Sequence, residues 1–319
     1  MPVPAQLTTG LKLPAVVAPM FLSSGPDLVV ETCRSGLIGT FPTLNQRTTA
    51  GYESWLDEIA DRLAASEEPA AAFGVNLIVH KSNTRLDADL AATVKHKVPL
   101  VITSLGAVSA VVEAVHSYGG VVFHDVIGRR HAEKAAEAGV DGIIAVCAGA
   151  GGHAGMLSPF ALVPEIRSVF AGTILLAGAI STGAQVAAAR MLGADLAYIG
   201  TRFLATGEAL VDPEHKRMIL EATAKDILYT AAISGVNANF LRPSLLRSGL
   251  DPDNLTGHAT LDLASEAKAW KDVWSAGQGV GSIGDILPAA QLCRRLIAEY
   301  EEARSSFLSG GTEVPGGRS

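Results

Sequence analysis

The stretch TILLAGAISTGAQVAAARMLGADLAYIGT, residues 173–201, contains the same pattern twice. An apolar run that starts at Thr173 is followed by small residues and by a stretch of helical period, Gly183–Leu192. Gly193 then precedes a second apolar run, Leu196–Leu204. Apolar runs without polar alternation are typical of parallel strands covered on both faces, and a glycine directly after a helix commonly ends it. The stretch therefore predicts two successive β-α units.

The pattern recurs along most of the chain, with Gly36 and Gly139 ending two further predicted helices. We expect a (β/α)₈ TIM barrel of the α/β class, because eight apolar runs are enough to close one. An open doubly wound sheet is the alternative, although no GxGxxG motif follows the first run. The eight runs are Val16–Met20, Leu37–Pro42, Ala71–Val79, Pro99–Leu105, Val121–Ile127, Gly142–Gly149, Thr173–Ser181 and Leu196–Leu204. The predicted helices between them are Pro26–Ser35, Tyr52–Ser66, Leu86–Lys95, Ala107–Ser117, Arg130–Ala138, Pro159–Phe170 and Gly183–Leu192.

The repeating pattern stops after the eighth run. A helical stretch near His215–Lys225 and a polar loop around Asp251–His258 precede a last helix, roughly Gly284–Arg304. A tail prominent in Ser, Gly and Pro is typical of a frayed end. The expected organisation is a barrel formed by residues 1–206 and 282–304, an inserted and mostly helical elaboration, 207–281, and a flexible tail, 305–319.

Composition excludes several classes of function. Among 319 residues the formal net charge is −7, with no basic cluster and only 5% aromatic residues, so nucleic acid is not an expected partner. No apolar run reaches the roughly 20 residues that span a bilayer, and the first ten residues lack a signal pattern, which predicts a cytoplasmic protein that does not bind membranes. Cys33, Cys147 and Cys293 have no CxxC spacing, which predicts buried thiols and no metal site.

Active sites of such barrels lie at the carboxyl ends of the strands. Gly178, after the seventh run, and Gly200-Thr201, after the eighth, suit a phosphate, because small residues let backbone N–H groups approach and a following helix N-terminus adds partial positive charge. The alternative is that these glycines serve only tight turns. Ser181-Thr182 is equally consistent with a simple helix cap.

The sixth rim, AGAGGHAG at residues 148–155, is the most specific feature. Four glycines within eight residues let the backbone come close to a flat or bulky group, and a single histidine, His153, projects into the same space. An imidazole can accept a proton near neutral pH, so we expect His153 to be the catalytic acid or base. The alternative is a histidine that only bonds loop backbone.

Other rim residues carry weaker signals. The amide of Asn76 ends an apolar strand and suits the edge of a heterocycle, or else loop backbone. Pro19 and Met20 suit packing on a ring face, or the core. Asp125 is a candidate cofactor contact or a loop cap, and its neighbour His124 must point to the opposite face of the strand.

The combined motifs resemble the nitronate monooxygenases, formerly called 2-nitropropane dioxygenases. The matching phrases are APM at 18–20, FGVN at 73–76, DGIIAVCAGAGGHAG at 141–155, LLAGAIS at 175–181 and GADLAYIGTRFLAT at 193–206, with weaker echoes in ISGVNANFLRP at 233–243 and AGQGVGSI at 276–283. The resemblance implies an FMN-dependent TIM barrel in which His153 is the base beside the flavin. It also implies that Asn76 and Met20 contact the isoalloxazine and that Gly151, Gly178, Gly200 and Thr201 surround FMN, the last three near its phosphate. Ala18, Pro19, Asp125 and Ala179 complete the expected cofactor site.

Two departures from the family pattern concern the substrate. Many members carry Gln and Glu where this chain has Val146 and Gly149, and a second glycine at Ala179. The expected reaction is oxidation of an alkyl nitronate or nitroalkane by O₂ to a carbonyl compound and nitrite. An NAD(P)H-dependent flavin reductase of quinones or enoyl thioesters is the alternative, and a flavin-binding barrel without catalysis is a third. The expected partners are thus a small-molecule substrate and O₂. A homodimer is possible, because helix-lined barrels often pair.

Overall fold

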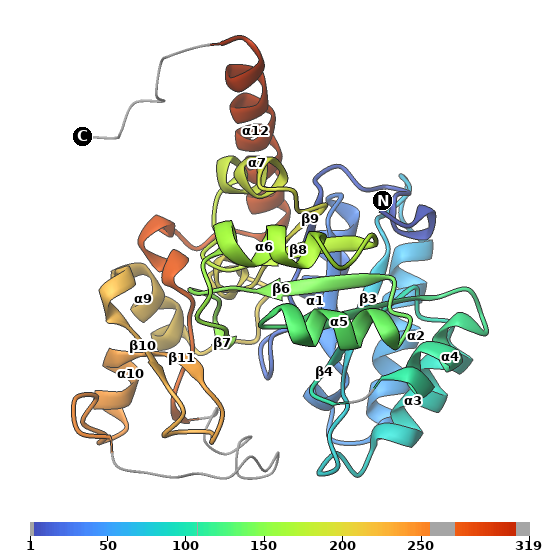
Figure 1. The fold of residues 1–319 in the computed structure, drawn as a ribbon, viewed down its shortest axis with the longest axis horizontal. Coiled ribbons are helices and arrows are strands. Elements are labelled where there is room, and N and C mark those ends of the chain that lie inside the picture. The colour runs from blue at the N-terminus through green and yellow to red at the C-terminus, as the bar shows by residue number, and fades with distance from the viewer. Residues whose placement is uncertain (1–2, 107, 256–271, 311–319) are drawn as a thin grey trace.

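Eight parallel strands close into a barrel in the computed structural model, which describes residues 3–106, 108–255 and 272–310 (Figure 1). Round the barrel the strands are β1 (Ala15–Val17), β2 (Ile38–Pro42), β3 (Phe73–Ile78), β4 (Leu100–Ser104), β5 (Val121–Val126), β6 (Gly142–Val146), β8 (Thr173–Ala177) and β9 (Leu196–Ile199). Each pairs in parallel with its neighbour, and Val16 opposite Tyr198 joins β1 to β9 and closes the ring. The predicted TIM barrel is confirmed, and the open doubly wound sheet is wrong.

Helices cover the outside of the barrel, as the sequence predicts. They are α1 (Pro26–Arg34), α2 (Thr49–Ala64), α3 (Leu86–Lys95), α4 (Ser109–His116), α5 (Arg129–Glu137), α6 (Pro159–Arg167), α7 (Gly183–Met191) and α12 (Ala289–Leu308). Residue 107, the expected start of the fourth helix, lies outside the described residues. Gly36, Gly139 and Gly193 follow their helices with φ of 90°, 83° and 98°, the left-handed conformation that glycine adopts most readily.

The last helix differs from its predicted bounds. It begins at Ala289 rather than Gly284, because Pro288 is its N-cap, and it continues to Leu308, inside the segment expected to be frayed. Its buried residues include Leu292 and Leu296, and the helix packs on α7 and α1. Packing of this apolar face stabilises the first half of the helix, and its last turn, with Phe307 and Leu308 exposed, continues the same helical backbone without burial. Residues 311–319 of that tail lie outside the described part.

Two apolar cores position the rim. One lies between the strands and the helices, and the other fills the barrel interior. Inward-facing residues in the lower barrel are aliphatic or aromatic, as with Ile102 and Phe123, both fully buried. Two positions further along the same strands the inward residues are Ser104 and Asp125, which line a cavity. At the carboxyl end of the barrel, a layer of polar side chains therefore lies directly on the apolar core of the barrel interior.

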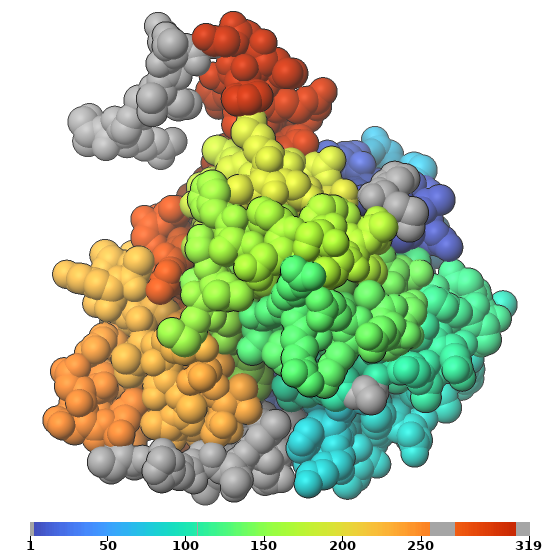
Figure 2. Space-filling model, viewed as in Figure 1, coloured from blue at the N-terminus to red at the C-terminus, as the bar shows by residue number. Residues whose placement is uncertain are grey.

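The segment after the barrel adds a small antiparallel sheet that the sequence did not predict. Strand β11 lies between β10 and β7, and β7 belongs to the loop after β6 (Figure 1). In Figure 2 the orange residues of this segment lie directly against the green residues of the barrel. The polar loop predicted around Asp251–His258 is described only to Leu255. The additional elements are β7 (Gly152–His153), β10 (Ile227–Thr230), β11 (Ala238–Leu241), α8 (Thr201–Leu204), α9 (Pro213–Glu221), α10 (Arg242–Arg247) and the short 3₁₀ helices η1 (Ala5–Leu7), η2 (Thr43–Asn45), η3 (Ala224–Asp226) and η4 (Gln278–Ser282).

The three cysteines are buried, as the sequence predicts. All three cysteines are buried free thiols, and burial raises the pKa of each to about 12, so none forms a thiolate near neutral pH. Within residues 3–106, 108–255 and 272–310, no helix combines the length and the apolar content needed to cross a bilayer. The same residues contain no group of His, Cys, Asp and Glu side chains that could hold a metal ion.

Candidate active site

A cavity of about 1300 Å³ opens at the carboxyl ends of the barrel strands. Every residue that the sequence assigns to the site lines it, although these residues come from six separate segments of the chain. They are Ala18, Pro19, Met20, Asn76, Asp125, Gly151, His153, Gly178, Ala179, Gly200 and Thr201. The structure therefore brings the predicted catalytic and cofactor residues together, and their individual roles stay predictions.

One wall of the cavity presents unused backbone donors. In the described chain, the N–H groups of Gly178, Ala179, Gly200 and Thr201 donate no hydrogen bond. Gly178 and Ala179 have φ of 144° and 54°, and consecutive residues in such conformations form concave sites for anions. Ala179 is strained there, since a left-handed alanine costs roughly 1–2 kcal/mol. Unpaired backbone donors are rare in proteins, so these four N–H groups, here called the phosphate wall, are available to an acceptor such as a phosphate.

Close approach explains the glycines of this wall. A Cβ added at Gly178 would lie 2.9 Å from the carbonyl oxygen of Ala148, and one at Gly151 would lie 3.1 Å from Thr201 Oγ1. At Gly200 the nearest atom would be Ala18 Cβ at 3.6 Å, which is ordinary contact. Gly178 is therefore required by space, a side chain at Gly151 would fit only tightly, and Gly200 mainly leaves room inside the cavity.

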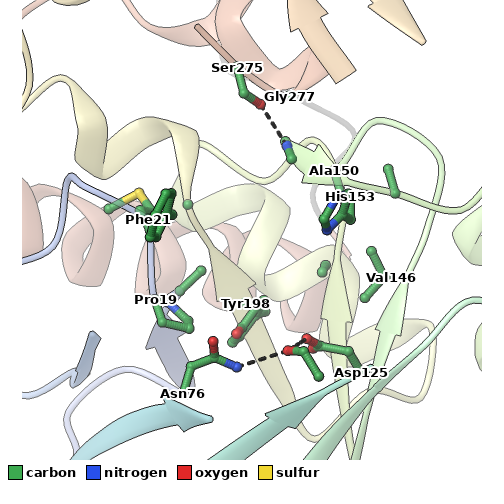
Figure 3. Close-up of a pocket in the computed structure, with 18 of the residues that line it drawn as sticks. Pro19, Phe21, Asn76, Asp125, Val146, Ala150, His153, Tyr198, Ser275 and Gly277 are labelled. Atoms are coloured by element: carbon green, nitrogen blue, oxygen red, sulfur yellow. Dashed lines mark hydrogen bonds between the residues drawn. The ribbon is translucent and has the colours of Figure 1, made fainter. Parts of the chain in front are cut away.

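His153 lies on β7, an edge strand of the small sheet. It stands opposite Ala238, and its neighbour Gly152 stands opposite Asn239. The Gly152 N–H donates to Ser275 Oγ at 2.7 Å, the interaction dashed in Figure 3. The N–H of Ala154 donates to the Asn237 carbonyl at 3.2 Å. The backbone on both sides of His153 is therefore held in place by hydrogen bonds to distant segments, at Ser275 on one side and at Asn237 on the other.

The floor of the cavity is polar. Ser104 Oγ donates to Asp125 Oδ2 at 2.5 Å and accepts from the Asn76 amide at 2.8 Å, and Figure 3 shows Tyr198 between Asn76 and Asp125. Burial raises the pKa of Asp125 to about 6. His124 points to the opposite face of β5, as predicted, where its Nδ1 lies 2.8 Å from Thr103 Oγ1. Desolvation lowers the pKa of His124 to about 4, so this second imidazole is neutral at physiological pH.

Comparison with known proteins identifies the family. The family model described as nitronate monooxygenase matches residues 56–299. The chain belongs to the nitronate monooxygenase family. A nitronate monooxygenase of Paraburkholderia phytofirmans is 31% identical, over 92% of this chain and 94% of the relative. An octahydro-1H-indene-4-carboxyl-CoA dehydrogenase of Rhodococcus jostii is 26% identical, over 78% of this chain and 68% of its own length. The solved nitroalkane oxidase of Streptomyces ansochromogenes has the same fold, with a TM-score of 0.80, 24% identity, and coverage of 92% of this chain and 97% of that one.

Membership of the nitronate monooxygenase family makes the chain a flavin-dependent oxidoreductase of a family that oxidises nitronates. The third reading of the sequence, a flavin barrel without catalysis, is therefore abandoned. The family match also covers the segment after the barrel, which extends the resemblance seen in the sequence well beyond residue 206.

Side chains of the protein itself cap the N-terminus of α7, the alternative that the sequence offered for Ser181-Thr182. The first amides of α7 are not free for a ligand: the N–H groups of Ser181 and Thr182 donate to Gln185 Oε1, and that of Gly183 donates to Glu299 Oε2 at 2.7 Å. Thr182 is the N-cap and completes a capping box with Gln185. The helix end is satisfied by the protein's own side chains, so the donors for an anion come from the turns.

We expect Thr182→Ala to separate the helix cap from the anion site. Loss of the cap should lower the free energy of unfolding by about 1 kcal/mol, while bound flavin per chain stays at the level of the unsubstituted protein. Urea unfolding and the flavin absorbance of the purified protein measure the two effects. Loss of flavin at unchanged stability would show that the helix end holds the cofactor after all.

A segment near the C-terminus completes the cavity and was not assigned from the sequence. The Gly277 N–H donates to Thr201 Oγ1 at 2.8 Å, and Ser181 Oγ donates to the Gly279 carbonyl at 3.0 Å. The N–H of Gln278 donates to the Gly149 carbonyl at 2.9 Å. The weak echo AGQGVGSI was the available signal for this segment. It joins the His153 loop to both turns of the phosphate wall.

We expect Ser275→Ala to loosen the strand that carries His153. The substitution removes the acceptor of the Gly152 N–H and the donor to the Asn239 carbonyl, at 2.7 Å each. An unsatisfied partly buried group costs about 1–3 kcal/mol, and misplaced catalytic groups lose rate, so kcat on a neutral nitroalkane should fall about 10-fold. Steady-state kinetics beside Ser117→Ala, whose hydroxyl bonds only within its own turn, measure the effect. Equal kcat in both variants would contradict this role.

Proposed function

We propose that the chain is an FMN-dependent nitronate monooxygenase that oxidises alkyl nitronates and nitroalkanes with O₂ to a carbonyl compound and nitrite, with His153 as the acid or base. One observation carries the proposal: His153 shares its cavity with a wall of four unused backbone N–H groups. A phosphorylated ring needs an anion site and a broad adjoining space, and both are present at the rim where barrel enzymes have their active sites.

The residues present fit FMN. The N–H groups of Gly178, Ala179, Gly200 and Thr201 would donate to the phosphate, because they have no other acceptor within the described residues. Pro19 and Met20 would pack on the isoalloxazine, and Asn76, Asp125, Gly151 and Ala18 would contact it from the floor and sides. The fit is supported by the shared lining and by the glycines at positions 178 and 200, which add no side chain to this wall.

His153 has two tasks in this proposal. With a neutral nitroalkane it removes the proton from the carbon next to the nitro group, and with a preformed nitronate it keeps a hydrogen bond to the anion. Bound flavin supplies the acceptor for two electrons and the reaction with O₂. Small and apolar residues beside His153, such as Ala150 and Val146, limit the access of water to the reacting carbon.

A second candidate is an NAD(P)H-dependent reductase of quinones or enoyl thioesters. Two observations favour it. The cavity must hold the flavin in either case, but at about 1300 Å³ it exceeds the 300–1,000 Å³ typical of small-molecule sites and leaves room for a substrate larger than a short nitroalkane. In addition, one relative is named as a dehydrogenase of a carboxyl-CoA.

Anaerobic stopped-flow mixing separates the two functions. The flavin-loaded protein is mixed with ethyl nitronate in one arm and with NADH or NADPH in the other, and the flavin absorbance is followed. The proposed function predicts rapid bleaching by the nitronate and little by the nicotinamides. Bleaching by NADH or NADPH alone would overturn it in favour of the second candidate.

A further inference from the structure

Asn76, Ser104 and Asp125 form a hydrogen-bond chain whose direction is fixed. The amide nitrogen of Asn76 lies 3.2 Å from the carbonyl oxygen of Ile102 and 2.8 Å from Ser104 Oγ. A carbonyl oxygen can only accept, so the atom facing Ile102 must be the amide nitrogen and not its oxygen. Ser104 Oγ therefore accepts from Asn76, and its own proton has a single acceptor among the described residues, Asp125 Oδ2 at 2.5 Å.

This direction determines which oxygen of Asp125 can carry a proton. A proton on Oδ2 would leave the Ser104 hydroxyl without an acceptor among the described residues, so a proton on the carboxyl group is favoured on Oδ1. Oδ1 is buried and has no hydrogen-bond partner among the residues that the structure describes. Buried polar atoms almost always have a partner, and Asp125 lines the cavity. Oδ1 is thus available to a ligand.

Two titratable side chains face Asp125, namely Tyr198 from β9 and His153 from β7. Burial raises the pKa of Asp125 to about 6, against smaller opposing effects of the Ser104 hydrogen bond and of His153. Burial, reinforced by the charge of Asp125, raises the pKa of Tyr198 well above its usual range, so the phenol stays neutral. His124 lies on the other face of β5. The Asp125 carboxyl group is accordingly protonated below about pH 6 and ionised above it.

We propose that Asp125 is a further catalytic group that donates a hydrogen bond from Oδ1 to the ring system of the bound flavin. This inference rests on the proposed function only for the presence of the flavin. Electrons gained by the ring increase the negative charge on its polar atoms, so a neutral donor stabilises the reduced ring more than the oxidised one. A carboxylate has the opposite effect. Protonation of Asp125 therefore favours electron uptake, and ionisation opposes it.

The test compares the unsubstituted protein with Asp125→Asn, in which an amide of similar shape donates at every pH. The midpoint potential of the bound flavin is measured between pH 5 and pH 8 by titration against redox dyes. We expect similar potentials at pH 5. At pH 8 and a fixed solution potential, the ratio of reduced to oxidised flavin should be about 10-fold lower in the unsubstituted protein, because one unit of pKa coupling is a factor of ten.

Ser104→Ala provides a second variant with a different signature. The Ser104 hydrogen bond lowers the pKa of Asp125, so its removal should move the fall in potential to higher pH. If the hydrogen bonds of Asn76, Ser104 and Asp125 had only a structural role, the pH at which the potential falls would not change. The inference would be overturned if the midpoint potential varied with pH in the same way in Asp125→Asn and in the unsubstituted protein. If Asp125→Asn did not bind flavin, the inference would be overturned by a Ser104→Ala variant whose potential falls at the same pH as that of the unsubstituted protein. Normal flavin content with parallel curves overturns this inference alone, whereas a protein that takes up no flavin overturns the proposed function as well.

Discussion

We expect His153→Asn to turn over neutral nitroethane roughly 10²–10⁴-fold more slowly than the unsubstituted protein, the range typical for removal of a general base. Asparagine keeps the size and polarity of the side chain but cannot accept a proton near neutral pH. Flavin content should stay normal, because the phosphate wall is formed by other turns. Nitrite release under air, with nitroethane as substrate, measures the effect.

The same variant carries an internal control. Ethyl nitronate has already lost the proton, so its oxidation by His153→Asn should suffer much less than that of nitroethane. His116→Asn is a matched variant, because this exposed imidazole bonds to Asp141 outside the cavity and should leave both rates within a few-fold. Equal turnover of nitroethane in His153→Asn and in the unsubstituted protein would remove His153 from proton transfer.

Gly178→Ala should weaken FMN binding about 100-fold. The added Cβ would lie 2.9 Å from the Ala148 carbonyl oxygen, in a backbone conformation with φ of 144° that side chains rarely adopt. Strain of this kind costs of order 1–3 kcal/mol, and its relief would displace the N–H groups that face the phosphate. Each 1.4 kcal/mol is a tenfold change in affinity. Titration of the flavin-free protein with FMN, followed by quenching of flavin fluorescence, gives the dissociation constant.

Gly193→Ala is the control for backbone strain alone. Gly193 has φ of 98° after α7, and a Cβ there would meet no atom within 4 Å. It does not line the cavity. The control should lose stability to unfolding yet bind FMN as the unsubstituted protein does. If both variants bound FMN equally well, the turn at Gly178 would have no part in holding the phosphate.

The barrel could be predicted because its signals are local. Each strand coincides with an apolar run, and the caps at Gly36, Gly139 and Gly193 follow from left-handed backbone that glycine tolerates best. The site residues could be predicted for a related reason. In this fold the carboxyl ends of the strands lie at one common rim, so six distant segments can be assigned to one cavity without knowing their distances.

Long-range pairing explains what the sequence did not reveal. Strand β7 is only Gly152–His153, and it exists because β11 lies beside it, some 85 residues further along the chain. Glu299 caps α7 across 116 residues, so nothing near Gly183 indicates that this helix end is occupied. Ala179 adopts a positive φ that its own residue type disfavours, and only the surrounding turn imposes it.

A crystal structure of the FMN-loaded protein tests the central claim most directly. The account predicts phosphate oxygens within hydrogen-bond distance of the N–H groups of Gly178, Ala179, Gly200 and Thr201, and the isoalloxazine between Met20 and the His153 imidazole. A phosphate bound elsewhere, or a ring on the far side of the barrel from His153, would contradict it.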